Sequence, residues 1–250
     1  MADNVYIKKL NVIDSTNRYA RDEARTLWDE AKGDNIIAIT ARWQTAGRGQ
    51  RGNTWHSKAD SNLLLTLLVR PGDSLKVTEQ FRLSQAAALA LHKAMMCYGI
   101  ETRLKWPNDI YVGKRKLAGI LLELDYTGLF VEQATIGIGL NINQCEFPIM
   151  DKEPVSMKML IKETLDVDGV LHNILESFKE HYCALKECDA AIATEYGRLL
   201  MGAGEECRFT DSAGEFTAVI EGVEPDGRLV LRTSDGSTRS YAFKEIEMTL

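Results

Sequence analysis

Apolar residues follow two different periods along the chain, and their alternation predicts a protein of mixed strands and helices. Residues 62–70 form a near-continuous apolar run that ends at Pro71, which is typical of a strand buried on both faces. From 78 to 98 the apolar positions recur at helical spacing and stop before Gly99, which predicts a core helix. Further strands are predicted at 5–10, 36–40, 110–112, 116–123 and 130–143, and further helices at 19–31, 157–164, 168–187 and 189–200.

The pattern changes at Gly202 and Gly204. After them, short apolar segments alternate with turn signals at regular intervals. Short strands with this spacing predict a small antiparallel barrel that closes its own edges. We therefore expect two domains, at residues 1–201 and 202–250. The strands of the second domain are predicted at 207–209, 216–223, 229–233 and 240–243.

Composition and charge are those of a soluble globular protein and argue against nucleic acid as the main partner. Hydrophobic residues make up 45% and charged residues 26% of the 250 positions, and the net charge is −6, an acidic balance unlike that of DNA-binding proteins. No apolar run is long enough for a signal peptide or a membrane span. The five cysteines form no C-x-x-C pair, so we expect reduced thiols in a cytoplasmic protein.

One basic stretch, residues 42–58, stands out against this acidic background. It carries Arg42, Arg48, Arg51 and Lys58 and no acidic residue, with glycines between the arginines. Guanidinium groups on such a backbone suit phosphate or carboxylate, which predicts an anion clamp. The G-x-G-x-x-G spacing does not indicate a dinucleotide fold, because an apolar strand follows rather than a helix. A solvated surface loop remains the plainer alternative.

A second stretch places charged and polar groups around a turn. Residues 105–109 read Lys-Trp-Pro-Asn-Asp, and a hairpin follows. Lys114 and Arg115 are consistent with a solvated hairpin tip. Lys116 differs because it opens an otherwise apolar strand, where a lysine is costly unless it has an anionic partner.

Two further segments each allow two interpretations. Residues 15–17, Ser-Thr-Asn, precede a predicted helix and either cap it or hold a polar ligand at its start. Gly137 and Gly139 lie in a predicted strand and either admit a ligand close to the backbone or relieve crowding between strands.

Taken together, these stretches resemble the biotin protein ligases. The motifs that carry the resemblance occur in the family's order and are those at 15–17, 44–52, 105–109, 115–120 and 137–141. The resemblance covers most of the chain. It implies an α+β fold, with a mixed β-sheet catalytic domain flanked by helices and a small SH3-like β-barrel at the C-terminus.

The resemblance also implies a two-step reaction. Biotin and MgATP would give biotinyl-5′-AMP and pyrophosphate, and a lysine of a biotin carboxyl carrier domain would then take the biotinyl group. By likeness of motif, Lys116 and Arg48 would be catalytic, and Asp109 would hold Mg²⁺. Biotin binding is assigned to Ser15, Thr16, Asn17, Gln44, Arg48, Gly49, Gln50 and Lys116. Nucleotide binding is assigned to Gly47, Arg51, Lys105, Asn108 and Asn141.

Some features depart from the family's pattern. The catalytic domain is expected to start at Val5, so we expect neither the DNA-binding domain of many relatives nor a repressor role. The position after Gly49 is often arginine in the family and is Gln50 here, which weakens the clamp. No adenine-stacking aromatic residue can be matched in the loop at 145–156, and no functional residue in the barrel.

Two other functions stay open from the sequence. A lipoate ligase or octanoyltransferase would share the catalytic architecture, and a biotin or nucleotide sensor would keep the pocket without needing Lys116. The oligomeric state, with a homodimer among the alternatives, and the identity of the carrier protein also stay open.

Overall fold

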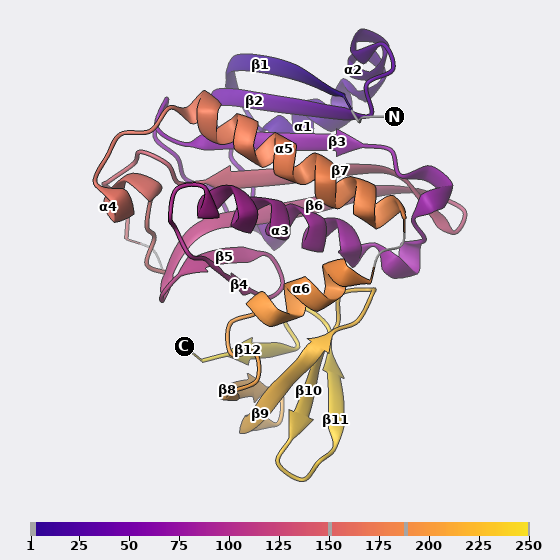
Figure 1. Ribbon diagram of the computed structural model, residues 1–250, viewed down its shortest axis with the longest axis vertical. Coiled ribbons are helices and arrows are strands. Elements are labelled where there is room, and N and C mark those ends of the chain that lie inside the picture. Colours follow the sequence, from indigo (N-terminus) through magenta and orange to yellow (C-terminus); the bar gives the residue numbers. More distant parts are fainter. Residues whose placement is uncertain (1–3, 150–151, 188–189, 250) are drawn as a thin grey trace.

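The computed structural model describes residues 4–149, 152–187 and 190–249. In these residues the chain forms a seven-stranded sheet flanked by helices and, after them, a five-stranded sheet (Figure 1). The N-terminal segments run along one edge of the larger sheet, and the smaller sheet lies at the opposite end of the molecule.

The larger sheet is mixed, as predicted. Its strand order is β1-β2-β3-β7-β6-β5-β4. Among the described strands, β1 and β2 are parallel, and the other neighbours are antiparallel. The strands are β1 (Val5–Ile13), β2 (Ile36–Gln44), β3 (Leu63–Val69), β4 (Arg103–Lys105), β5 (Asp109–Val112), β6 (Arg115–Thr127) and β7 (Phe130–Leu140).

Helices cover both faces of this sheet, which explains the unbroken apolar run of β3. Helices α3 (Phe81–Met96) and α5 (Val167–Lys186) lie across one face (Figure 1). Residues such as Leu67 pack in the core on that side, whereas Leu68 packs with Ile37 and α2 on the other. All seven residues of β3 are buried, so the prediction of a strand buried on both faces is confirmed. The remaining helices are α1 (Thr16–Asp22), α2 (Ala24–Ala31), α4 (Met157–Ile161) and α6 (Ala191–Leu199), with single 3-10 turns at Gln50–Gly52, Gly72–Ser74 and Val77–Glu79.

The smaller sheet is antiparallel and has its own core around Phe209 and Leu231. Its strands are β8 (Glu206–Asp211), β9 (Gly214–Val223), β10 (Leu229–Thr233), β11 (Thr238–Tyr241) and β12 (Ile246–Met248). It joins the larger domain through Trp106, whose indole Nε1 donates to the Gly227 carbonyl at 2.9 Å. The boundary between residues 201 and 202 stays a prediction.

The structure differs from the sequence prediction in a few elements. The segment at 19–31 was expected as one helix, but it is two, because the backbone leaves helical geometry at Glu23 (φ −103°, ψ 13°). Strands β4 and β12 were not predicted, since three residues with no clear alternation give no period to detect. The start of the helix expected at 189–200 falls partly outside the described residues. No helix in the described part of the chain is long and apolar enough to cross a membrane.

Candidate active site

A cavity of about 960 Å³ lies beside strands β6 and β7 and extends to the smaller sheet. Several separate parts of the chain meet there: the start of α1, the basic loop after β2, the turn before β5, and β12. Of the residues predicted from sequence, the cavity is lined by Ser15, Thr16, Asn17, Gln44, Arg48, Gly49, Gln50, Lys105, Asn108, Asp109 and Lys116. Gly47 and Asn141 do not line it, and the side chain of Arg51 lies outside the described parts of the structure.

One end of the cavity holds a network of hydrogen-bonded polar groups. Ser15 caps α1 by accepting a hydrogen bond from the backbone N–H of Arg18. The hydroxyl of Thr16 donates to Gln44 Oε1 at 2.9 Å, and Thr66 donates to Asn17 Oδ1 at 2.7 Å. Because Thr16, Asn17 and Thr66 are almost fully buried, this network fixes the orientation of the Asn17 and Gln44 amides. Ser15 thus caps the helix, and the segment at 15–17 also lines the cavity. That it holds a ligand stays a prediction.

Glycines of β6 and β7 form the floor next to this polar end. Gly119 pairs with Gly139, and Leu121 with Gly137. A Cβ atom on Gly137 would lie 2.3 Å from Asn17 Oδ1. These strands need glycine there because other groups approach the backbone closely.

Trp55, which the sequence analysis did not assign, lies on that floor. A Cβ atom on Gly139 would lie 2.3 Å from the Trp55 ring. The indole Nε1 of Trp55 is buried and has no hydrogen-bond partner among the described residues. Its place in the basic loop was the signal available from the sequence, but only the fold shows which strands the ring covers.

The other end of the cavity gathers lysines around one carboxylate. Lys116 Nζ lies 2.6 Å from Asp109 Oδ1, and Lys152 Nζ lies 2.8 Å from Asp109 Oδ2. Asp109 is thus the anionic partner that the sequence analysis required for Lys116. Burial lowers the pKa of Lys116, and the charge of Asp109 acts in the opposite direction. Burial likewise lowers the pKa of Lys105, with a further lowering from the charge of Lys152.

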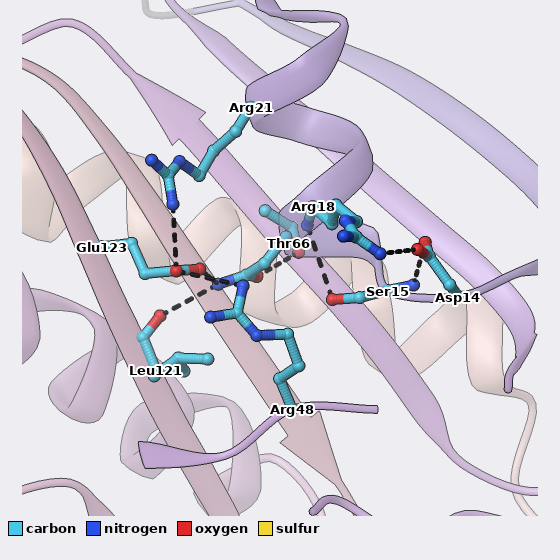
Figure 2. A network of polar contacts seen from close by, with 9 residues as sticks. Asp14, Ser15, Arg18, Arg21, Arg48, Thr66, Leu121 and Glu123 are labelled. Atoms are coloured by element: carbon cyan, nitrogen blue, oxygen red, sulfur yellow. Dashed lines mark hydrogen bonds and ion pairs between the residues drawn. The ribbon is translucent and has the colours of Figure 1, made fainter. Parts of the chain in front are cut away.

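Arg48 points to a different part of the site. Its guanidinium lies 3.2 Å from Glu123 Oε1, on the same carboxylate that pairs with Arg21 and accepts from the Asn17 amide (Figure 2). Glu123 and Lys116 are seven residues apart on β6, or about 23 Å along the strand. The structure therefore does not bring Arg48 to Lys116. The sequence analysis missed Glu123, the carboxylate that contacts both Arg48 and Asn17.

The group around Asp109 fits a magnesium ion that arrives with phosphates. No cluster of three or more His, Cys, Asp or Glu side chains suited to a metal occurs in the described residues. Asp109 Oδ1 is buried and lacks a well-directed hydrogen bond there, although Lys116 lies close to it. One such carboxylate suits Mg²⁺, which takes one or two protein carboxylates and completes its shell with substrate phosphates and water.

A glycine-floored cavity that ends in a lysine cluster suits the activation of a carboxylate by ATP, which is the chemistry of a ligase. Residues 10–141 match the model of the biotin/lipoate A/B protein ligase family, and residues 202–248 match that of the biotin protein ligase C-terminal domain. The chain belongs to the biotin/lipoate A/B protein ligase family.

Individual proteins agree with this assignment. The chain is 31% identical over 236 residues to the bifunctional ligase/repressor BirA of Bacillus spizizenii, across 93% of this chain and 71% of that protein. It is 32% identical over 206 residues to the biotin–[acetyl-CoA-carboxylase] ligase of Paracoccus denitrificans, across 79% and 85%. The structure of the biotin protein ligase from Aquifex aeolicus in complex with biotin and ATP matches the fold with a TM-score of 0.76, at 24% identity and 98% coverage of both chains.

These matches confirm the predicted family and the predicted α+β fold with a C-terminal SH3-like barrel.

Proposed function

We propose that this chain is an ATP-dependent biotin protein ligase that forms biotinyl-5′-AMP and transfers biotin to a lysine of a carrier domain. The observation that carries the proposal is the cavity itself. It has oriented neutral amides at one end, glycine backbone along its floor and a lysine cluster at the other end. An apolar ring system with one polar urea and a distant carboxylate has the same three parts in the same order.

The length of the cavity supports this placement. Leu121, opposite Gly137, and Lys116 are five residues apart on β6, which is about 17 Å of strand. In the proposed pose, the urea meets the Asn17 and Gln44 side chains, the rings lie along the glycines, and the carboxylate reaches Lys116.

In the first step, a biotin carboxylate oxygen bonds to the α-phosphorus of ATP, and the bond from that phosphorus to the β-bridging oxygen breaks. Pyrophosphate leaves with the electron pair. Lys116 stabilises the negative charge that gathers on the α-phosphate, because a fixed cation in a poorly solvated site acts more strongly on the transition state than on the ground state. Lys105 and Asn108 line the same part of the cavity and would hold the nucleotide.

Asp109 would hold Mg²⁺, which when bound supplies positive charge to the triphosphate. Lys116 and Lys152 now occupy the two oxygens of Asp109, so this role requires one of them to give way to the metal.

In the second step, the amine of the carrier lysine attacks the acyl carbon, and the bond to the AMP oxygen breaks. The mixed anhydride has to be kept from water until then. The proposed cover is the loop with Gly47, Arg48, Gly49, Gln50 and Arg51, and its glycines allow it to reorder. Asn141 acts from outside the cavity, because its amide donates to the Val155 carbonyl at 3.2 Å and holds the neighbouring segment.

The acceptor follows from the name of a relative, a biotin–[acetyl-CoA-carboxylase] ligase. We propose the biotin carboxyl carrier domain of such a carboxylase as the protein partner. Specific DNA binding is not part of the proposal, given the net charge of −6. A cytoplasmic location and a homodimer stay predictions, which fractionation and sedimentation would test.

ATP–pyrophosphate exchange with biotin, lipoate and octanoate supplied in turn tests the proposal. We expect exchange with biotin. Exchange with lipoate or octanoate in its place would indicate the other branch of the family. Biotin binding without any exchange would indicate a sensor.

A further inference from the structure

Lys152 belongs to a segment that is fixed against the start of β6. The backbone N–H of Lys116 donates to the Glu153 carbonyl at 2.8 Å, and the N–H of Val155 donates to the Lys116 carbonyl at 2.9 Å. Because the residue next to Lys152 is hydrogen-bonded to Lys116, both lysines reach the same carboxylate.

This end of the cavity carries more positive than negative charge. Lys105, Lys116 and Lys152 line it together with two acids, Asp109 and Glu247, and the charge of Glu247 acts on Lys105. The two acids can neutralise two of the three lysines. Crowding like charges in a partly desolvated site is unfavourable unless an anion is bound there. The surplus therefore favours an anionic ligand, and a phosphate chain can contact more than one of these lysines at once.

The two lysines on Asp109 differ in depth. The Lys116 side chain is 21% exposed and lies beside the glycine floor, whereas the Lys152 side chain is 52% exposed. Lys116 thus faces the proposed point of attack at the α-phosphate. Lys152 lies on the other oxygen of Asp109, toward the open side, where the remainder of the triphosphate would extend.

We propose that Lys152 binds the β- and γ-phosphates of ATP and the pyrophosphate that they become. The assignment rests on the proposed function, because Lys152 would be a second cation, after Lys116, and would contact the pyrophosphate that leaves in the proposed adenylation. When the bond between the α-phosphorus and the β-bridging oxygen breaks, the electron pair stays on that oxygen. Lys152 leaves Asp109 and donates a hydrogen bond to the departing pyrophosphate.

Lys152→Met tests the assignment, since methionine keeps much of the length of the side chain and removes its charge. Lys114→Met is the matched control, because Lys114 is exposed at the tip of the hairpin and does not line the cavity. Lys152→Arg asks whether a cation alone is sufficient. The measurements are the KM values for ATP and pyrophosphate in exchange, and transfer from preformed biotinyl-5′-AMP to the carrier domain.

For Lys152→Met we expect both KM values to rise about tenfold to a hundredfold, as for the loss of a charge-assisted hydrogen bond. Transfer from preformed adenylate should stay within about twofold, because pyrophosphate takes no part in it. Lys152→Arg should recover most of the loss, and Lys114→Met should match the wild type. Calorimetric titration of the ligand-free protein with magnesium pyrophosphate should show the same order of affinities.

Unchanged KM for pyrophosphate and unchanged calorimetric affinity in Lys152→Met would overturn the assignment. So would a parallel loss of transfer, because it would show that Lys152 only supports the fold of the site. If the wild-type chain shows no ATP–pyrophosphate exchange with biotin, lipoate or octanoate, the proposed function is overturned, and this assignment with it.

Discussion

Lys116 combines burial, a short ion pair and a position at the head of β6. Replacing it with alanine removes the cation proposed to meet the α-phosphate, and Asp109 keeps Lys152 as a partner. We expect Lys116→Ala to lower the rate of adenylate formation at least ~10²-fold, since the transition state loses more stabilisation than the ground state. Pyrophosphate exchange measures this rate. If folded Lys116→Ala exchanges pyrophosphate at the wild-type rate, Lys116 is not a catalytic residue.

The sequence revealed some site residues and concealed others for a physical reason. Lys116 was visible because a lysine in an apolar strand conflicts with its neighbours. Trp55 and Thr66 look like ordinary residues of a loop and a strand. Glu123 ends an apolar run and reads as a solvated strand end. Their positions in the site depend on which strands lie side by side, and strand pairing cannot be predicted from the local sequence.

At the scale of elements, the facing glycines of β6 and β7 make room for the Trp55 ring, and the proposed biotin would lie against the same floor. A methyl group on Gly139 would overlap the Trp55 ring. We expect Gly139→Ala to raise the Kd for biotin at least about tenfold, a cost typical of overpacking a tight site. The control is Gly222→Ala, because a Cβ atom there meets nothing within 4 Å. Isothermal titration calorimetry compares the Kd for biotin of the two variants. Equal affinities for the two variants would mean that the ligand does not lie on this floor.

Helix α3 carries a histidine that should make stability depend on pH. His92 Nδ1 lies 2.8 Å from Thr102 Oγ1. Burial lowers the pKa of His92 below 6.5; the charge of Glu195 acts in the opposite direction, and the charge of Arg103 lowers the pKa further. The unfolded chain then binds the proton more readily, so this contribution to stability is present above pH 6.5 and is lost as the pH falls through the lowered pKa. Urea unfolding at pH 7.5 and at pH 5.0 measures the free energy of unfolding. Between these two pH values, that free energy should fall less for His92→Gln than for the wild type. An equal loss would contradict this.

Sequence periodicity predicted most elements of the larger sheet, because β3 and α3 contrast sharply with the turns around them. It missed the break at Glu23, where apolar positions continue through a change of direction. Nor could it give the strand order, since β3 pairs with β7 across a sequence separation that no local pattern records.

At the scale of the whole molecule, Trp106 links the smaller sheet to the segment that carries Asn108 and Asp109. Its indole donates to the Gly227 carbonyl, and its ring lies edge-on to Phe243, 6.1 Å between centroids. Trp106→Phe keeps an aromatic ring and removes the hydrogen bond. We expect a loss of about 1 kcal/mol in the free energy of unfolding and a higher KM for ATP than for the wild type.

Trp43→Phe is the control for that experiment, because Trp43 is 42% exposed on β2. Denaturant midpoints and ATP kinetics compare the two variants. If Trp106→Phe loses stability but keeps its KM for ATP, the smaller sheet supports the fold without influencing the nucleotide.

If Arg48 binds the ligand as proposed, Glu123 would compete with that ligand for its guanidinium. Any anionic ligand that recruits this guanidinium first has to displace a carboxylate that the protein itself supplies (Figure 2). The Arg48 side chain is 48% exposed, so the pair is worth at most about 1 kcal/mol, and a phosphate can displace it. Each ligand is therefore held somewhat less tightly than its own contacts would allow. When the ligand leaves, Glu123 would pair with Arg48 again, which would favour turnover over retention.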